Sequence, residues 1–240
     1  MTYKLPNIEE KSVYVEKMFN KIAQKYDLFN DIITFGMHRK WKRFTAHKTE
    51  LKDEQSCLDL CCGTGDIARE VLRQYPSSKV TGLDFSEKML NVAKSKNTSD
   101  LAVKYMSGDA MKIPFHDEEF NAITIGYGMR NVQDISQFLE EILRVLKPEG
   151  VLVSLDVGKV GIPILKELNN FYFFHIVPFV GKLLIPGEKI FKYLPESTKK
   201  YPNQESLKNF MIEKGFHKVE FYNFIFGAST VHVAYKPAKN

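Results

Sequence analysis

The sequence predicts an α/β protein with a doubly wound, seven-stranded, mostly parallel sheet that contains a reversed C-terminal strand. Short runs of β-branched and apolar residues alternate with amphipathic stretches between Gln55 and Asp156, which is typical of parallel strands joined by crossover helices. Two further runs near the C-terminus are joined by a short turn at 226–229, and such a hairpin requires antiparallel strands. The chain has 240 residues, of which 44% are hydrophobic, enough for one domain with a substantial core.

The elements of this sheet can be expected in order along the chain. Helical material at residues 13–29 and 37–47 comes first and should pack across the top of the sheet. Five strands are then expected at residues 56–60, 79–83, 102–106, 120–125 and 151–155. Helices should begin at Asp66, Ser86 and Asp134, where Ser86 is a suitable N-cap. The segment 147–150, Lys-Pro-Glu-Gly, is typical of a helix stop that returns the chain to a strand.

A change of pattern after Asp156 predicts an inserted helical cover. Aromatic residues gather there among several prolines. A helix at 203–214 closed by Gly215, and strands at 218–225 and 230–235, then complete the fold. We therefore expect a single domain, 1–240, that divides into an N-terminal helical cap, a cofactor-binding core, a lid that holds the acceptor, and a C-terminal helix with its hairpin. These parts are residues 1–50, 51–156, 157–202 and 203–240.

Three neighbouring strand ends carry groups suited to a nucleoside. Gly63 and Gly65 flank Thr64 in the turn after the first strand, where a backbone without Cβ atoms can approach a ligand closely. Asp84 ends the second strand and can accept both ribose hydroxyl hydrogens. Asp109 and Ala110 follow the third strand, where they can hold an adenine edge.

The glycine pattern alone leaves two cofactor classes open. Gly63, Gly65 and Ala68 also fit the G-x-G-x-x-[GA] motif of nicotinamide-dependent oxidoreductases. Asp59, however, lies inside the first strand, and neither it nor Asp66 would help to bind a diphosphate. Both acids would favour a ligand with a sulfonium and an ammonium group, although Asp66 is equally suited to be a simple acid at a helix N-terminus.

Several longer motifs resemble one family over essentially the whole chain. The chain resembles the class I, Rossmann-like S-adenosylmethionine-dependent methyltransferases, and among them the ubiquinone/menaquinone biosynthesis C-methyltransferases. The glycine loop and the Leu-Lys-Pro segment are generic to methyltransferases, whereas the Gly-Met-Arg-Asn and His-Arg-Lys-Trp stretches are far more specific. The matching stretches are residues 25–31, 35–43, 58–66, 126–132, 144–150, 174–178 and 193–197.

The resemblance implies an enzyme that methylates a ring carbon of a polyprenylated quinol, with demethylmenaquinol as the favoured acceptor and another small lipophilic acceptor as an alternative. It implies S-adenosylmethionine as cofactor, with contacts from Thr64, Asp84, Asp109 and Ala110. The full set expected to bind the cofactor is Tyr26, Asp59, Gly63, Thr64, Gly65, Asp84, Phe85, Asp109, Ala110 and Gly126. Gly126 departs from the Ser common in relatives, Cys61 and Cys62 replace small residues, and Glu149 replaces a common Gly.

Carbon methylation of a quinol also requires a group that makes the ring nucleophilic. A phenolic hydroxyl titrates near 10, so the site must lower that pKa or remove the proton during attack. Arg130 can stabilise the phenolate or orient a water, Asn131 can hold a quinol oxygen, and His175 can be a base or a partner of a quinol oxygen. A structural ion pair for Arg130, and simple packing for His175 and His38, are the alternatives. Tyr26 and Tyr127 can face a sulfonium, and no metal is expected.

The charge distribution favours contact with an anionic membrane surface. The net charge is +5, and the excess lies in residues 1–50 and 157–200, so lysines of the lid can lean toward headgroups. No targeting segment is visible, and the sequence predicts a cytoplasmic protein at the inner face of the membrane. The three cysteines should be reduced, nucleic acid is not an expected partner, and a homodimer is compatible with the sequence.

Overall fold

A seven-stranded sheet organises the molecule, as the sequence predicts. The computed structural model describes residues 8–99, 101, 103–185 and 190–239. The strand order is β3-β2-β1-β4-β5-β7-β6, and β7 is antiparallel to both of its neighbours while the other pairs are parallel. The strands are β1 (Ser56–Leu60), β2 (Lys79–Asp84), β3 (Lys104–Ser107), β4 (Phe120–Gly126), β5 (Leu146–Val157), β6 (Lys218–Phe224) and β7 (Ser229–Tyr235).

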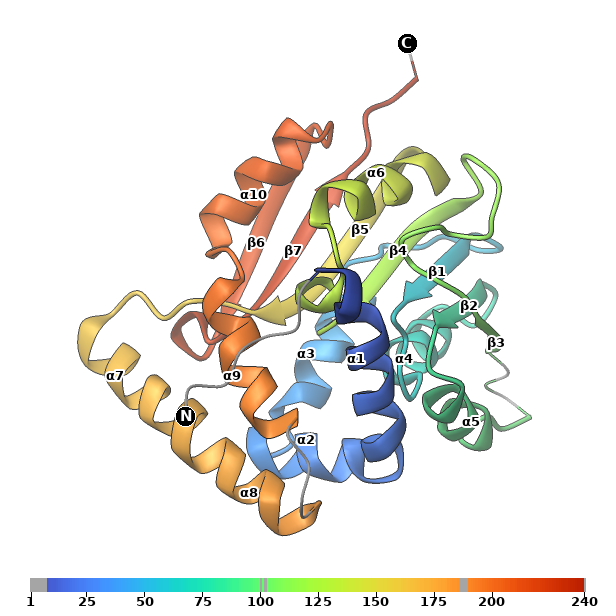
Figure 1. Cartoon of the computed structure of the whole chain (residues 1–240). Helices are drawn as coiled ribbons and strands as arrows, with labels where there is room; N and C mark the ends of the chain where they lie inside the picture. The colour runs from blue at the N-terminus through green and yellow to red at the C-terminus, as the bar shows by residue number, and fades with distance from the viewer. Residues whose placement is uncertain (1–7, 100, 102, 186–189, 240) are drawn as a thin grey trace.

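Helices cover both faces of this sheet (Figure 1). On one face, α6 (Ile135–Val145) and α10 (Gln204–Glu213) bury Phe138, Ile142 and Met211 against strand residues such as Ile123. On the other face lie α3 (Met37–His47), α4 (Asp66–Gln74) and α5 (Glu87–Ser95). The apolar faces of these helices have no other place to avoid water, so the doubly wound arrangement follows from their amphipathic patterns.

A third apolar cluster lies apart from the two sheet faces and joins the N-terminal helices to the lid. It combines Val15, Met18 and Phe29 with Val177 and Phe191. The N-terminal part consists of α1 (Ile8–Ile22), a 3-10 turn at Ala23–Lys25 and α2 (Tyr26–Thr34). The lid consists of α7 (Pro163–Phe171), a π-helical turn at Tyr172–Ile176, α8 (Val177–Leu184) and α9 (Ile190–Lys200). Figure 1 shows α7 and α8 as one long rod at the lower left, beyond α9.

The observed bounds differ from the expected ones at a few places. The helix expected at 13–29 is interrupted by the 3-10 turn, and α3 packs on a face of the sheet against α4 rather than across its top. Strand β5 begins at Leu146, so the segment 147–150 belongs to the strand, and the β4–β5 register shifts between Phe120 and Ala122. Ser86 caps α5 as expected, since its hydroxyl accepts a hydrogen bond from the backbone N–H of Met89. Ala102, the first residue of the expected third strand, lies outside the described residues.

No helix in the described ranges is both long and apolar enough to cross a bilayer.

Candidate active site

The carboxyl ends of β1 and β2 form the first part of the site. These strands are parallel neighbours, so the turns that follow them meet at one edge of the sheet. Asp84 Oδ2 accepts a hydrogen bond of 2.8 Å from the backbone N–H of Gly63, and Oδ1 accepts one of 2.8 Å from that of Ser86. Burial raises the pKa of Asp84 to about 6 in spite of these bonds. A buried carboxylate in this state is stabilised by further donors, and the two hydroxyls of a ribose would supply them.

The turn after β1 requires glycine at two positions, because of its backbone conformation and its packing. Gly63 and Gly65 have φ angles of +55° and +75°, and a Cβ on Gly65 would meet the ring of Tyr105 at 2.1 Å from its hydroxyl oxygen. A small polar cavity lies beside this turn. It is lined by Tyr26, Lys42, Asp59, Cys61, Cys62, Gly63, Thr64, Asp66, Ile67, Gly126 and Tyr127. The backbone of this turn and the carboxylate of Asp84 are groups suited to the amino-acid and ribose parts of S-adenosylmethionine, beside a cavity of about 30 Å³.

Other residues expected at the cofactor have different surroundings. Asp59 lines the small cavity, but its oxygens accept hydrogen bonds from the Thr124 hydroxyl and the Ala68 backbone N–H, and burial raises its pKa to about 7. The Asp59 carboxyl therefore connects β1 with β4 and α4 through hydrogen bonds. At neutral pH it is only partly ionised. Asp109 is exposed, and Ala110 is buried in the core cluster that also contains residues of α6. Phe85 packs against the cluster formed by the N-terminal helices and the lid.

Asp66 is neutralised within the protein. Its carboxylate forms ion pairs with Lys42 at 2.7 Å, Arg69 at 2.5 Å and Lys96 at 3.4 Å. Although burial opposes ionisation, these cations hold the pKa of Asp66 well below its usual range. The expectation that Asp66 attracts a sulfonium is therefore not supported, because its charge is already balanced.

The N-terminal helices close over the cofactor edge through side-chain contacts. The Thr64 hydroxyl donates to Asp27 at 2.7 Å, and the Ser86 hydroxyl donates to Asn20 at 2.8 Å. Lys96 also pairs with Asp27. These contacts place α1 and α2 directly over the turns that follow β1 and β2.

A large apolar cavity of about 740 Å³ lies between the N-terminal helices and the lid. Its volume lies within the range of small-molecule sites. Most of its wall is aromatic and aliphatic, with Phe29, Phe173 and Phe191 among the lining residues, and polar groups such as Arg130 and Asn131 are few. Such a wall suits a flat ring that carries a long hydrocarbon chain.

Tyr26 and Tyr127 line both the small cavity and the large one. They therefore lie where the cofactor edge meets the acceptor space. Burial raises the pKa of Tyr26, and it also raises that of Tyr127, so both rings are neutral phenols at physiological pH. The Arg130 guanidinium already lies over the Tyr127 ring, 5.7 Å from its centroid, so a sulfonium contact of the kind that the sequence suggests remains an expectation for Tyr26.

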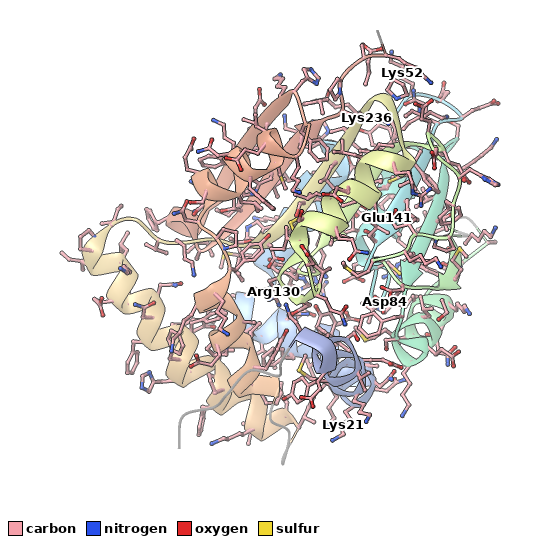
Figure 2. The ribbon with its side chains drawn as sticks, turned by 45° about the horizontal axis from the view of Figure 1, so that its top comes forward. Lys21, Lys52, Asp84, Arg130, Glu141 and Lys236 are labelled. Atoms are coloured by element: carbon pink, nitrogen blue, oxygen red, sulfur yellow. The ribbon has the colours of Figure 1, made fainter. Side chains whose placement is uncertain are left out.

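Arg130 and Asn131 follow β4 in a short 3-10 turn, Met129–Asn131, and both line the large cavity. The Arg130 side chain is 7% exposed, and its Nη1 forms an ion pair with Asp156 at 2.6 Å and donates to the Tyr127 carbonyl at 2.8 Å. The buried Nε of Arg130 has no hydrogen-bond partner among the described residues. Asn131 donates to the same carbonyl, and its oxygen accepts from the Tyr193 hydroxyl at 3.1 Å. Figure 2 shows Arg130 and Asp84 at the edge of the sheet that faces α1, with Lys236 far from them.

The structure does not bring His175 to this site. Its side chain is exposed, its ring stacks on Phe171 with centroids 5.0 Å apart, and it is not among the residues that line the large cavity. His175 lies on the exposed side of α7 and α8, where its Nδ1 is 3.2 Å from the carbonyl oxygen of Phe171. Its expected role as a base or partner of a quinol oxygen has no support in this geometry.

Two residues of the site, Asp156 and Lys42, were not predicted from the sequence. Asp156 is the last residue but one of β5, next to β4, and could have been identified by the same strand-end rule that identified Asp84. Lys42 lines the small cavity and is 8% exposed. Its place depends on how α3 packs against α4, and a sequence pattern does not reveal that.

No cluster of three or more metal-ligating side chains exists among the residues that the structure describes. The cysteines of this part of the chain, Cys57, Cys61 and Cys62, are all free, and burial raises the thiol pKa of each.

The sheet order, the glycine turn with its strand-end acid and the adjoining apolar cavity define a class I methyltransferase. Solved structures share this fold. A possible histamine N-methyltransferase of the S-adenosylmethionine-dependent kind from Thermotoga maritima aligns with a TM-score of 0.65 at 19% identity, over 92% of this chain and 99% of that one. An S-adenosylmethionine-dependent methyltransferase from Methanococcus maripaludis, itself described as putative, aligns with a TM-score of 0.63 at 18% identity, over 92% and 94% of the two chains. At such identities these structures show the fold alone.

Sequence comparison gives the family. The model of the ubiE/COQ5 methyltransferase family matches residues 7–236. A protein from Leptospira interrogans named demethylmenaquinone methyltransferase is 42% identical over 99% of this chain and 98% of its own length. A protein of the same name from Staphylococcus aureus is 38% identical over 94% of both chains. The chain belongs to the ubiE/COQ5 methyltransferase family, and the nicotinamide-dependent oxidoreductase that the glycine pattern left open is excluded.

Proposed function

We propose that this enzyme transfers a methyl group from S-adenosylmethionine to a ring carbon of demethylmenaquinol, as a step of menaquinone biosynthesis. One observation carries the choice of a lipid-tailed quinol. Tyr26 and Tyr127 line both the small cavity at the cofactor edge and an apolar cavity of about 740 Å³ whose polar groups include Arg130 and Asn131. A bicyclic ring can meet these polar groups while its isoprenoid chain lies along the aromatic wall. The names of the relatives from Leptospira and Staphylococcus agree with this acceptor.

When bound, the cofactor supplies an electrophilic methyl group on a positively charged sulfur. Asp84 would accept hydrogen bonds from the ribose hydroxyls, and the backbone of the turn at Gly63 would contact the amino-acid part. Tyr26 and Tyr127 would exclude water from the space between the two ligands. Alignment of the acceptor carbon in such a pocket can lower the barrier by about 7–11 kcal/mol.

Arg130 and Asn131 would bind the quinol oxygens. Arg130 keeps its charge because Asp156 pairs with it, so its guanidinium would stabilise a phenolate as negative charge develops on the oxygen. Asn131 is held by the Tyr127 carbonyl and the Tyr193 hydroxyl, which fixes the direction of its amide. A ring anchored at both groups would present the adjacent carbon toward the junction at Tyr26 and Tyr127.

Anaerobic transfer of a labelled methyl group tests this function. We expect label in the product with reduced demethylmenaquinone, and a kcat/KM at least about tenfold lower with a prenylated methoxy-benzoquinol or a phytyl-naphthoquinol, a difference of about 1.4 kcal/mol. Preferred methylation of the benzoquinol would assign the enzyme to ubiquinone biosynthesis instead. Labelling of none of the three would reject a quinol as the acceptor.

We further propose that the lid docks on an anionic membrane surface, from which a lipid-tailed acceptor would enter the cavity. Exposed apolar side chains follow one another at helical spacing along α7 and α8, at Ile164, Leu168, Phe171, Phe179 and Leu183, which are 56% to 82% exposed. Leu168 and Phe171 also line the cavity, as do Phe35 and Phe226, which are 80% and 66% exposed. The apolar surface is therefore continuous with the mouth of the cavity.

The charged residues of α7 and α8 support the proposal that this surface docks on anionic lipid. Lys166 and Lys182 are exposed on α7 and α8, beside one exposed acid, Glu167. Lysines at the margin of an apolar face attract anionic headgroups, by about 1 kcal/mol each. A neutral apolar patch would bind membranes of any charge, so the lysines make the proposal specific for anionic lipid.

Vesicle sedimentation tests the docking surface. The wild-type enzyme should sediment with phosphatidylglycerol vesicles at low salt and less at high salt, and weakly with phosphatidylcholine vesicles. Replacing Phe179 and Leu183 with Ser should lower the bound fraction at least about fivefold, since each exposed side chain loses about 1.5–3 kcal/mol of transfer free energy when it no longer enters the membrane. Ile212→Ser is the matched control, because Ile212 is 44% exposed on α10 and does not line the cavity. Equal sedimentation of the double variant and the control would contradict the proposal.

A further inference from the structure

The methylation proposed above requires a group that takes the phenolic proton, and Arg130 cannot be that group. A guanidinium stays protonated in proteins and has no lone pair to accept a proton. The pairing with Asp156 favours the charged form further. Arg130 can stabilise a phenolate, but the proton must leave for another atom.

His38 is a buried histidine in the wall of the large cavity, and only one of its ring nitrogens has a hydrogen-bond partner among the described residues. It lies in the first turn of α3, is 2% exposed and lines the large cavity. Its Nε2 lies 2.8 Å from Asp31 Oδ1. Its Nδ1 is buried and has no hydrogen-bond partner among the described residues. Among the described residues that line this cavity, His38 is the only imidazole.

Asp31 fixes which nitrogen of His38 carries the proton. Arg39 donates to both carboxylate oxygens of Asp31, at 2.8 and 2.6 Å, and keeps the pKa of Asp31 below its usual value. An ionised carboxylate accepts, so the Nε2 of His38 must donate to it. The Nδ1 of the neutral ring then carries the lone pair. The unpartnered atom is therefore an acceptor, which is the state that a base requires.

The charges around His38 keep the ring neutral near pH 7. Burial and the ammonium of Lys42 lower the pKa of His38 below its ordinary value of 6.5, and these effects outweigh the carboxylates of Asp31 and Asp66, which raise it. Arg39 also faces Asp31 from the same helix as His38. Lys42 and Asp66, whose charges act on His38, line the small cavity at the cofactor edge.

We infer that His38, oriented by Asp31, accepts the phenolic proton of the quinol, an inference that rests on the proposed function. The O–H bond breaks, its proton moves to Nδ1, and its electron pair increases the electron density of the adjacent ring carbon. That carbon forms a bond with the methyl group while the bond between methyl and sulfur breaks, with its electron pair going to sulfur. The methylated carbon then loses its hydrogen to solvent as a proton, the ring becomes aromatic again, and the oxygen recovers a proton from Nδ1. One proton is released in total.

His38→Gln tests the inference with a variant of similar size. The wild-type kcat/KM should fall on the acid side with a midpoint below 6.5, since His38 is protonated there and cannot accept. His38→Gln should lower kcat at least about a hundredfold, the usual contribution of a general base, and should lose this acid limb. S-adenosylhomocysteine binding by calorimetry should be unchanged. Asp31→Asn, a positioning variant, should lower kcat and move the acid limb to lower pH, because it removes a carboxylate that raises the pKa of His38.

Two controls separate this role from a structural one. His116→Gln changes an exposed histidine outside both the lid and the cavity and should leave kcat and its pH profile unaltered. His38→Ala should regain activity in the presence of added imidazole, which replaces the base but would not repair misfolding. A His38→Gln enzyme that turns over within about threefold of wild type, with the same acid limb, overturns the inference while the proposed function stands. A wild-type enzyme that binds S-adenosylhomocysteine but methylates no quinol overturns both.

Discussion

Asp84→Ala abolishes the binding of S-adenosylhomocysteine, by at least about a hundredfold in Kd, while the protein remains folded. The carboxylate is buried, its two oxygens fix the backbone at Gly63 and Ser86, and no other acid lies at the end of β2 to receive the ribose. The loss therefore combines the ribose hydrogen bonds, each to a charged acceptor and worth about 1.5–3 kcal/mol, with a looser glycine turn. Calorimetry measures the affinity, and far-UV circular dichroism verifies the fold.

Asp84→Asn distinguishes a binding role from a structural one. The variant keeps the size of the side chain and removes its charge. Because the folded-state pKa of Asp84 is raised to about 6, above the unfolded value near 3.9, ionisation of this group costs stability that increases as pH rises through that interval. The difference in free energy of unfolding between variant and wild type should thus shift in favour of the variant by about 1 kcal/mol between about pH 5 and about pH 8. Cofactor affinity retained in this variant would contradict a role of the Asp84 charge in binding.

The fold could be predicted because its determinants are local. The strand runs are apolar and bounded by turn residues, and the chemistry at their ends follows from their order in a parallel sheet. The break between α1 and α2 was not predictable, since Ala23 and Lys25 carry no helix-breaking signal. It arises from tertiary packing, in which Ala23 is buried and α2 contacts α8 of the lid. Tertiary contacts of this kind regularly override the helix propensity of a local sequence.

The site residues were predictable only where a residue lies at the end of a strand or directly after it, and its position there implies its role. Asp84, Gly63 and the Arg130 segment follow that rule, and the structure gathers them at one edge of the sheet. This rule does not apply to His175, which lies in the helical lid. The sequence shows that this segment is an amphipathic helix but does not show which side of the helix faces the cavity. The state of Asp66 was likewise hidden, since its partners Lys42 and Lys96 come from distant segments that only the folded chain brings together.

Arg130→Ala, by contrast with Asp84→Ala, should leave cofactor affinity intact and lower turnover at least about tenfold, about 1.4 kcal/mol of transition-state stabilisation. Arg130 follows β4 and lines the acceptor cavity but not the small cavity beside the glycine turn, so its loss concerns the developing phenolate. Turnover equal to wild type would remove Arg130 from the mechanism.

The ion pair with Asp156 complicates the alanine variant. Both side chains are buried, and an uncompensated buried carboxylate costs about 3–5 kcal/mol of stability. The double variant Arg130→Gln with Asp156→Asn removes both charges, so it should be more stable than Arg130→Ala and yet equally slow if the guanidinium stabilises the phenolate. Arg130→Lys keeps the charge without the planar fork, which also donates to the Tyr127 carbonyl. It should therefore recover stability but only part of the turnover. If turnover followed the melting temperature across these three variants, the ion pair alone would account for Arg130, and the phenolate would have to be stabilised by another group.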